Sequence, residues 1–273
     1  MSGSLSDAAD LIDLERYPIV TPGSEAGRNL VARCRTTIDR DGILILDDFA
    51  TPQAVAAMVD EARAVEDQAW FCAHRHTVYQ TDGKEAAPEG AARTRLVTSD
   101  KGNVAMDRIP RDGPLRTLFD WPQLHRFLTA VLGLPELHPY GDPLAGLMIN
   151  VNRTGEQLGW HFDKAEFAVT LMLQPPQAGG AFRYLPNVRT GGAAEDAAED
   201  AAVGAVLDGD ETGLIDLAPP AGTLVVFRGR DSLHCVAPVV GPRARLVGVL
   251  SYAREPGQRM DAESQMLFHG RVA

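Results

Sequence analysis

The 273-residue sequence has only three cysteines, few aromatic residues and no excess of positive charge. Cys34, Cys72 and Cys235 are odd in number and widely separated, which disfavours a disulfide framework and a thiolate metal site. The formal net charge of −11 argues against a nucleic-acid backbone or an anionic membrane as partner. No apolar run reaches the roughly 18 residues of a membrane-spanning helix, and the N-terminus lacks the pattern of an export signal. We therefore expect a cytoplasmic protein.

The composition that remains is that of an ordinary globular protein, 45% hydrophobic and 23% charged. The chain is long enough to bury one full core. About six strand-like runs are separated by turn signals and are not joined by long helical crossovers, which indicates a mainly antiparallel β-sandwich or jelly roll with flanking helices. We expect a single domain over 1–273, with a helical and loop part at 1–140, the jelly-roll core at 141–255 and a C-terminal tail at 256–273.

Periodicity and turn residues place the individual elements. Helices are predicted at 25–41, from 51 to about 70, at 114–134 and at 193–207. Strands are predicted at 43–46, 144–151, 161–174, 181–185, 223–227 and 243–252. Residues 71–113 are polar and irregular apart from a possible strand at 76–80, and the Gly/Pro-rich piece at 83–90 has the composition of a mobile loop or lid.

The first chemical signal is a histidine and an aspartate two residues apart, His161 and Asp163. Side chains alternate along a strand, so both would point the same way. The apolar residues of the same parity would make this the inward face: Phe167, Val169, Leu171 and Leu173. An imidazole and a carboxylate aimed into an apolar interior are costly to bury without a partner. A divalent metal is the natural partner, and this nitrogen–oxygen pair suits Fe(II), Mn(II) or Zn(II).

A third ligand is expected at His234, which follows a core strand and a tight turn at Gly229. It lies 73 residues beyond His161 (234 − 161). Two imidazoles and one carboxylate on one face of an octahedron leave three adjacent positions free, as in non-haem Fe(II) oxygenases.

An arginine at the start of the last strand helps to distinguish among the possible metal-dependent reactions, because it indicates an anionic ligand. Arg243 leads into a strand that is apolar on both faces, and its guanidinium needs an anionic partner there. The far carboxylate of a dicarboxylate would fit its bidentate fork. Arg245 has the same parity, so the sequence leaves open which of the two serves, with Arg243 preferred.

On His161, Asp163, His234 and Arg243 the chain resembles the Fe(II)/2-oxoglutarate-dependent oxygenases. The spacing of nine from His234 to Arg243, within H-x-V-x-P, is similar to the prolyl-hydroxylase type. Longer stretches resemble the bacterial branch that includes the BesD/HalD amino-acid halogenases and their hydroxylase relatives: SDKGNVAMDRIP, LGWHFDKAEFAVTLMLQ, GGAFRYLP, FRGRDSLHCVAPV and the terminal LFHGR. The likeness covers nearly the whole chain.

The resemblance implies a double-stranded β-helix core of the cupin-like jelly-roll type and a defined set of cofactors. His161, Asp163 and His234 would hold Fe(II), to which the cosubstrate 2-oxoglutarate and O2 bind. Arg243 or Arg245 would clamp the far carboxylate of 2-oxoglutarate, helped by Asn150 or Asn152. Succinate and CO2 are released, and an unactivated C–H bond is oxidised.

The residue at position 163 sets the reaction type that the resemblance implies. The halogenases have a small residue there, which leaves room for chloride, whereas this chain has a carboxylate. We therefore expect hydroxylation, or desaturation by the same oxidant, and no halogenation.

The substrate implied by the family is a free amino acid or an amino-acid-like small molecule, with a carrier-bound substrate as the alternative. His74, His76, Tyr79 and Arg95 are candidate substrate contacts in the lid region, and Trp160 is a further candidate beside the metal strand. The sequence leaves the oligomeric state open, with a homodimer as one option.

Two other readings compete with an oxygenase. One is a cupin-type metal enzyme that uses no 2-oxoglutarate, and the other is a ligand-binding barrel with a vestigial site. The complete set of His161, Asp163, His234 and Arg243 favours the oxygenase over both.

Overall fold

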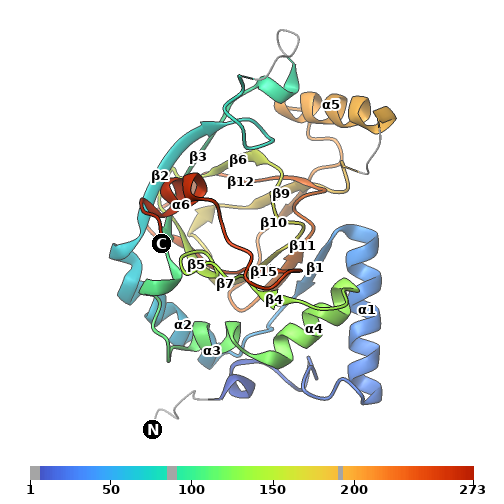
Figure 1. Ribbon diagram of the computed structural model, residues 1–273, viewed down its shortest axis with the longest axis vertical. Helices are drawn as coiled ribbons and strands as arrows, with labels where there is room; N and C mark the ends of the chain where they lie inside the picture. The colour runs from blue at the N-terminus through green and yellow to red at the C-terminus, as the bar shows by residue number, and fades with distance from the viewer. Residues whose placement is uncertain (1–6, 85–90, 190–192) are drawn as a thin grey trace.

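The computed structural model describes residues 7–84, 91–189 and 193–273 (Figure 1). The helices are η1 (Ala8–Leu11), α1 (Glu25–Asp41), α2 (Pro52–Val65), η2 (Glu66–Gln68), η3 (Ala92–Thr94), η4 (Met106–Arg108), α3 (Pro114–Phe119), α4 (Pro122–Leu132), α5 (Ala193–Leu207) and α6 (Ala262–His269). The strands of the two main sheets are β1 (Ile43–Leu46), β2 (Trp70–His76), β3 (Val97–Val104), β5 (Leu147–Asn152), β6 (Leu158–His161), β7 (Ala168–Gln174), β9 (Phe182–Leu185), β10 (Ile215–Leu217), β11 (Leu224–Phe227), β12 (Leu233–Val236) and β14 (Arg245–Leu250). Two short pairs, β4 (His138–Pro139) with β15 (Tyr252–Ala253) and β8 (Ala178–Gly179) with β13 (Val239–Val240), complete the set.

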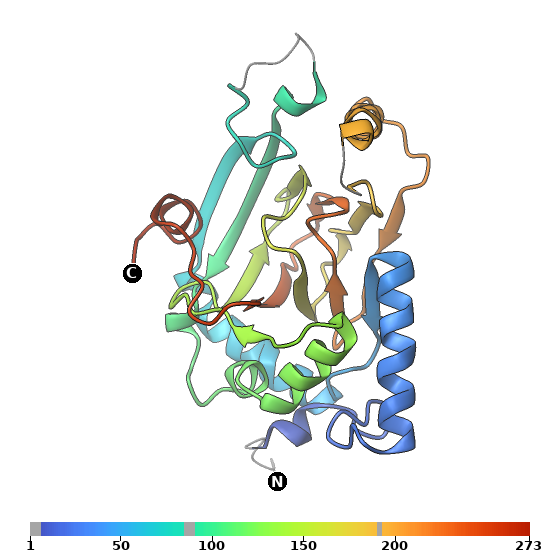
Figure 2. The ribbon, with the colours of Figure 1, turned by 45° about the vertical axis from the view of Figure 1, so that its right-hand side comes forward.

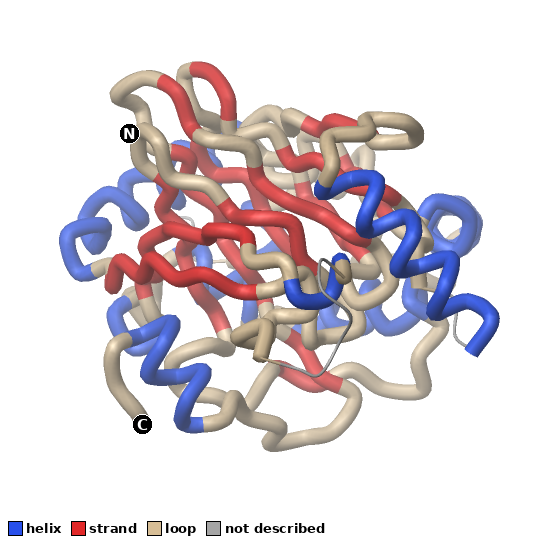
Figure 3. Tube along the Cα trace, turned by 90° about the horizontal axis from the view of Figure 1, so that it is seen from above, coloured by secondary structure: helices blue, strands red, loops and turns tan. Residues whose placement is uncertain are grey.

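Two antiparallel sheets form the centre of the molecule. The larger has seven strands in the order β1-β11-β7-β14-β5-β3-β2, and the smaller has four in the order β10-β9-β12-β6. Consecutive segments such as β5 and β6 belong to different sheets, as expected of a jelly roll. Seen from above, the strands occupy the middle and the helices the periphery (Figure 3). The predicted fold class, mainly β with flanking helices and a jelly-roll core, is confirmed.

The helices α1, α2, α3 and α4 cover one face of the larger sheet (Figure 2). Alternation along the strands sends one set of side chains toward these helices, where Leu44, Val169 and Val226 join the main core. The other set faces the smaller sheet, where Ile43, Val225 and Phe227 pack with Tyr184. This second cluster packs directly against the functional site, where Phe227 contacts His234.

The predicted strand 161–174 is wrong in one respect that matters for the site. The chain leaves the smaller sheet after His161, turns, and enters the larger sheet only at Ala168. Val169 and Leu171 therefore pack against the helix-covered core and do not share a face with His161. The turn coincides with the charged stretch Asp163-Lys164-Ala165-Glu166, but the hydrophobic pattern does not say which sheet the next strand joins.

The predicted irregular region 71–113 is also wrong, because it holds the long hairpin of β2 and β3 at one edge of the larger sheet. Its inward face is polar, with residues such as His74 and Lys101, so it does not show the apolar alternation of an ordinary strand. The proposed lid at 83–90 lies mostly at 85–90, outside the described residues. The predicted tail at 256–273 contains helix α6, which packs beside β2 and β3 (Figure 1).

The remaining elements agree with the sequence to within a few residues. The helices at 25–41, 114–134 and 193–207 and the strand at 43–46 are confirmed. Within the described ranges, no helix is both long and apolar enough to span a bilayer.

Candidate metal centre

Three side chains from three places converge between the sheets. His161 ends β6 and His234 lies on β12, where the two residues are direct cross-strand partners. Asp163 follows in the turn after β6. Its Oδ1 lies 3.6 Å from His161 Nε2 and 3.5 Å from His234 Nε2. The three ligand atoms lie within 4.8 Å of one another, a spacing that a single metal ion would satisfy.

Both imidazoles are held in the orientation that a metal requires. His161 Nδ1 donates to the carbonyl of Gly159 over 2.8 Å, and His234 Nδ1 donates to the carbonyl of Ser232 over 2.9 Å. Each Nε2 is then the unprotonated nitrogen and points at Asp163. Backbone acceptors on the far ring nitrogen are a common means of fixing metal-binding histidines.

The carboxylate of Asp163 is fixed from behind by Gly229. The Asp163 amide donates to the Gly229 carbonyl over 2.9 Å. A Cβ placed on Gly229 would approach Asp163 Cγ to 2.6 Å, so a side chain there would displace the carboxylate. Burial raises the pKa of Asp163, but hydrogen bonds and positive charge from His234 and His161, when those rings are protonated, outweigh it and hold the pKa below its ordinary range. The group is an anion at neutral pH.

Aromatic side chains from both sheets pack against His234. The ring of His234 lies 4.9 Å from that of Phe227 and 5.5 Å from that of Phe182, centroid to centroid. Burial, followed by the charge of His234, lowers the pKa of His161. Aromatic rings therefore shield His234, and burial favours the neutral form of His161.

A second layer of hydrogen bonds ties β2, β3 and β6 together behind His161. His76 Nδ1 donates to the Thr77 carbonyl over 2.8 Å, and its Nε2 accepts from Ser99 Oγ over 2.7 Å. Ser99 Oγ in turn accepts from the Gly159 amide over 3.0 Å. His76 is thus buried with both nitrogens occupied. Its predicted role as a substrate contact in a lid is wrong.

The structure reverses the order of the two candidate arginines. Arg243 precedes β14, is exposed and donates to the Pro176 carbonyl over 3.0 Å. Arg245 begins β14, is buried, and its Nε has no partner in the described part of the chain. Burial lowers the pKa of Arg245 to about 10, so it remains charged at neutral pH. The preference for Arg243 fails because the strand, and with it the inward alternation, starts two residues later.

The two predicted asparagines lie with Arg245 on the inward face of the larger sheet. Asn152 is the cross-strand partner of Arg245, and Asn150 is that of Val247. The side-chain oxygen of Asn150 and both polar side-chain atoms of Asn152 lack partners among the described residues. Buried polar atoms without partners are rare in folded proteins, so this group marks a place for a ligand or water.

The other predicted substrate contacts fall into two groups. Tyr79, Trp160 and Arg95 line the side of the molecule near α5: Tyr79 and Trp160 pack on the Phe162 cluster, and Arg95 Nη1 lies 2.7 Å from Asp208 Oδ1. Arg95 is therefore held by an ion pair. His74 lies instead on the inward face of β2, with its Nδ1 unpartnered within the described ranges.

Two residues near the centre are absent from the predicted set. Lys101 is on β3 in the Ser99–Lys101–Asn103 alternation, and His269 ends α6 with both ring nitrogens unpartnered in the described ranges. Both belong to stretches that carry the family likeness, which was the available signal. Their polar surroundings gave no apolar pattern to reveal that they face inward.

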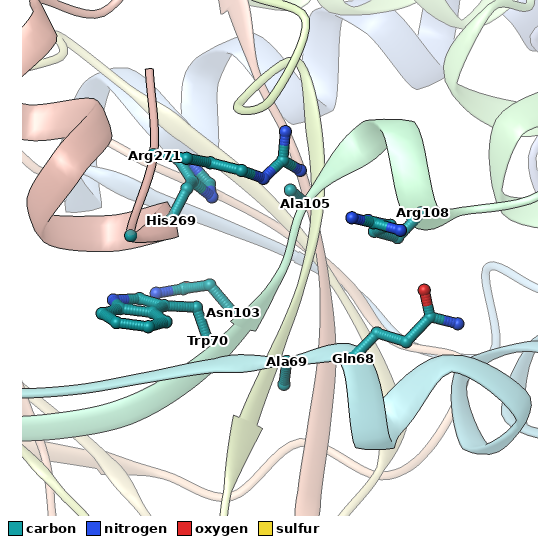
Figure 4. A pocket seen from close by; sticks show the side chains of 9 residues that line it. Gln68, Ala69, Trp70, Asn103, Ala105, Arg108, His269 and Arg271 are labelled. Atoms are coloured by element: carbon teal, nitrogen blue, oxygen red, sulfur yellow. The ribbon is translucent and has the colours of Figure 1, made fainter. Parts of the chain in front are cut away.

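A cleft of about 390 Å³ opens at the C-terminal end of α6 (Figure 4). Asn103 and His269 connect it to the inward face of the larger sheet, and Trp70, Arg108 and Arg271 form its rim. Arg271 is paired with Asp107 over 2.6 Å. The cleft is therefore adjacent to the polar interior and not over the three metal-type ligands.

Comparison with solved structures identifies the fold. The epimerase SnoN from nogalamycin biosynthesis, solved with Fe3+, alpha ketoglutarate and nogalamycin RO, has a TM-score of 0.55 at 15% identity, over 86% of this chain and 85% of that one. A 2OG-Fe(II) oxygenase family oxidoreductase from Burkholderia pseudomallei gives 0.51 at 17% identity, over 84% and 92%. A Pseudomonas putida prolyl-4-hydroxylase gives 0.50 at 16% identity, over 85% and 100%. At these identities the likeness concerns the fold.

Sequence comparison is more specific. No curated protein matches the chain. The family described as Halogenase D matches residues 26–267, which includes every residue of the candidate centre. The chain therefore belongs to the Halogenase D family, within the Fe(II)/2-oxoglutarate oxygenases.

Proposed function

We propose that the protein is an Fe(II)- and 2-oxoglutarate-dependent oxygenase that hydroxylates an unactivated C–H bond of a small, amino-acid-like molecule. The observation that carries the proposal is the convergence of His161, Asp163 and His234, with both Nε2 atoms turned to one carboxylate oxygen. Membership of the Halogenase D family and the shared fold support it.

The donor set fits Fe(II). Two imidazoles in their neutral form and one carboxylate would hold the ion from one side and leave positions open on the other, the arrangement used by non-haem iron oxygenases. Iron with 2-oxoglutarate, when bound, activates O2 and delivers one oxygen atom to a C–H bond with release of succinate and CO2. The contribution of His161, Asp163 and His234 is to hold the metal rigidly, through the backbone contacts at Gly159, Ser232 and Gly229.

Arg245 is the residue that we assign to the far carboxylate of 2-oxoglutarate. A buried guanidinium without an anionic partner is unfavourable, and a carboxylate is its best geometric match. Asn152 lies opposite it on β5 and offers an unpartnered amide to the same ligand. Arg243, exposed and held by Pro176, is not part of this assignment.

Asp163 decides between hydroxylation and halogenation in this proposal. Chloride would need the coordination position that the carboxylate takes, and the carboxylate is already oriented toward both histidines. The enclosing rings of Phe182 and Phe227 keep water from that side. The chain's task is then to place the substrate carbon next to the open positions. A desaturation would use the same residues, and a carrier-bound substrate would use the same centre.

The test is oxygen-dependent succinate formation from 2-oxoglutarate by anaerobically Fe(II)-loaded protein, with pooled amino acids and with chloride present. We expect substrate-stimulated succinate that disappears in Asp163→Ala, and a product that has gained one oxygen atom. A chlorinated product would overturn the hydroxylase assignment, and loss of two hydrogens would indicate desaturation. A wild-type protein that binds neither Fe(II) nor 2-oxoglutarate would refute the oxygenase and leave a ligand-binding barrel. Metal-dependent turnover without 2-oxoglutarate would indicate a cupin-type enzyme.

A further inference from the structure

A second group of polar side chains lies on the inward face of the larger sheet and has no role in the centre described above. It comprises Lys101 on β3, His74 on β2 and His269 at the end of α6. Cross-strand pairing connects it to the 2-oxoglutarate side: Lys101 is opposite Cys72, and the β3–β5 register continues to Asn152, the partner of Arg245. Lys101 on β3 is therefore separated from Arg245 on β14 by one strand, β5.

Helix α6 covers this group on the inward face of the sheet. Asn103 Nδ2 donates to the Phe268 carbonyl over 3.2 Å, and Trp70 Nε1 donates to the Leu267 carbonyl over 3.1 Å, which fixes the helix to β3 and β2. The Phe268 ring lies 5.9 Å from Lys101 Nζ, and its centroid lies 6.0 Å from that of His74. Lys101 and His74 thus lie together around the Phe268 ring beneath α6. His269 lines the adjacent cleft in Figure 4 and is within electrostatic range of Lys101.

Several polar atoms of this group have no partner among the described residues. Lys101 forms no ion pair with a carboxylate there, and its Nζ lies near the Phe268 ring. His74 Nδ1 and both ring nitrogens of His269 also lack hydrogen-bond partners in the described ranges, although His269 is only 4% exposed. An ammonium and two imidazoles that converge without an acceptor are a place for an anion.

The titration behaviour of the group agrees with a single positive charge. Burial, helped by the charges of His76, Lys101 and His161, lowers the pKa of His74 to about 4. Burial likewise lowers the pKa of His269 to about 4. Both imidazoles are therefore neutral hydrogen-bonding groups at neutral pH. Burial also lowers the pKa of Lys101, and Asp163 opposes this shift, so electrostatic contact reaches the candidate metal centre.

Counting charges indicates which anion is missing. Fe(II) contributes two positive charges, Asp163 one negative, 2-oxoglutarate two negative and Arg245 one positive, which sums to zero. Lys101, which is half-buried, then leaves one positive charge without a carboxylate partner among the described residues. A single carboxylate would balance it.

We infer that Lys101, together with His74 and His269, binds a carboxylate of the substrate in the compartment beneath α6. The inference rests on the proposed function and narrows the substrate to a small molecule with a free carboxylate. The carboxylates of 2-oxoglutarate are the other source of the same chemistry. Arg245 and the metal already account for those, and α6 surrounds Lys101 on the side away from Arg245.

The experiment measures binding to protein loaded with Mn(II) and 2-oxoglutarate, which does not turn over. The probes are the proteinogenic amino acids and short carboxylic acids, each beside its primary amide, followed by calorimetry or thermal shift. We expect at least one free acid to bind wild type about tenfold or more tighter than its amide. In Lys101→Met the acid should lose that advantage, and Lys101→Arg should keep part of it. The affinity for 2-oxoglutarate, measured anaerobically by the visible band of its Fe(II) complex, should stay within about threefold of wild type.

Matched controls separate the inference from its alternatives. Arg16→Met removes an exposed cation that is paired with Asp48, and it should change neither affinity. Lys101→Gln provides a polar variant if the methionine variant does not fold. Weaker 2-oxoglutarate binding with unchanged acid binding would assign Lys101 to the cosubstrate and overturn the inference. Equal losses for acid and amide, or a wild type that binds no acid of the panel, would also overturn it. Failure of wild type to bind Fe(II) and 2-oxoglutarate would instead refute the proposed function itself.

Discussion

The rings of His76 and His161 lie 6.1 Å apart at right angles, and Ser99 links their two strands. Ser99 gives its proton to His76 and accepts the amide proton of Gly159, whose carbonyl orients His161. A histidine that the sequence offers as a substrate contact thus serves to position a metal-type ligand. Hydrogen bonds of this outer layer commonly tune metal affinity as strongly as some ligands do.

Ser99→Ala should therefore weaken metal binding without touching the metal. The Gly159 amide and His76 Nε2 would both lose a partner, at a cost of about 1–3 kcal/mol in the free energy of unfolding. We expect about a tenfold loss of Mn(II) or Fe(II) affinity, measured by titration of the apo protein, and a lower Tm. Thr36→Ala removes an exposed hydroxyl bonded to the Ala32 carbonyl and serves as control. A lower Tm with unchanged metal affinity would restrict Ser99 to a structural role.

Gly229→Ala tests the position of the third ligand. The added methyl group would lie 2.6 Å from Asp163 Cγ, so the carboxylate must turn away from the two histidines. We expect a loss of metal affinity of at least about tenfold, with a circular-dichroism spectrum like that of wild type. Gly23→Ala is the matched control, because nothing lies within 4 Å of the Cβ it would add. Wild-type affinity in Gly229→Ala would show that Asp163 is dispensable as a ligand.

The sequence was sufficient to find the candidate centre, and the reason is chemical. Two histidines and an aspartate that follow or precede core strands have few ways to be satisfied in an apolar interior, so His161, Asp163 and His234 could be grouped before any coordinates. The change of sheet between β6 and β7 could not be predicted. The charged residues at 163–166 mark a break, but strand periodicity carries no information about which sheet a strand joins.

The arginines and the β2–β3 hairpin show a second limit. Arg243 and Arg245 share parity, and the choice between them depends on the residue at which β14 starts to pair, which is a tertiary property. Lys101 was missed for a different reason. Its strand faces a polar compartment, so the alternation that reveals a buried face is missing.

Arg245→Met should impair 2-oxoglutarate binding, whereas Arg243→Met should not. Arg245 is buried with a free Nε, so its removal deletes the only charge that we assign to the far carboxylate. Charge-assisted pairs of this kind correspond to a loss of at least about tenfold in affinity. Anaerobic titration of Fe(II)-loaded protein with 2-oxoglutarate measures it, and Arg243→Met should stay within about twofold of wild type. The reverse order of the two variants would restore Arg243 to the role that the sequence suggested.

The buried carboxyl group of Glu61, which lies far from the metal centre, should make the free energy of unfolding depend on pH. It is buried on α2, and its Oε2 accepts the amide proton of Leu115 over 3.1 Å at the start of α3. Its Oε1 has no hydrogen-bond partner in the described residues. Burial, opposed by the Leu115 hydrogen bond, raises its pKa from 4.5 to about 7. The fold therefore holds a proton that the unfolded chain releases.

Because the folded-state pKa is the higher one, the stabilisation is complete below about pH 4.5 and is lost as pH rises toward about 7. The loss should be about 3 kcal/mol in the free energy of unfolding. Glu61→Gln keeps an acceptor for Leu115 but cannot ionise, so it should be more stable than wild type at pH above 7 and similar to it at low pH. Urea unfolding across this range measures the difference. Asp60→Asn, an exposed acid on the same helix, should leave the pH profile unchanged. A Glu61→Gln profile parallel to wild type would mean that Glu61 is already ionised in the fold.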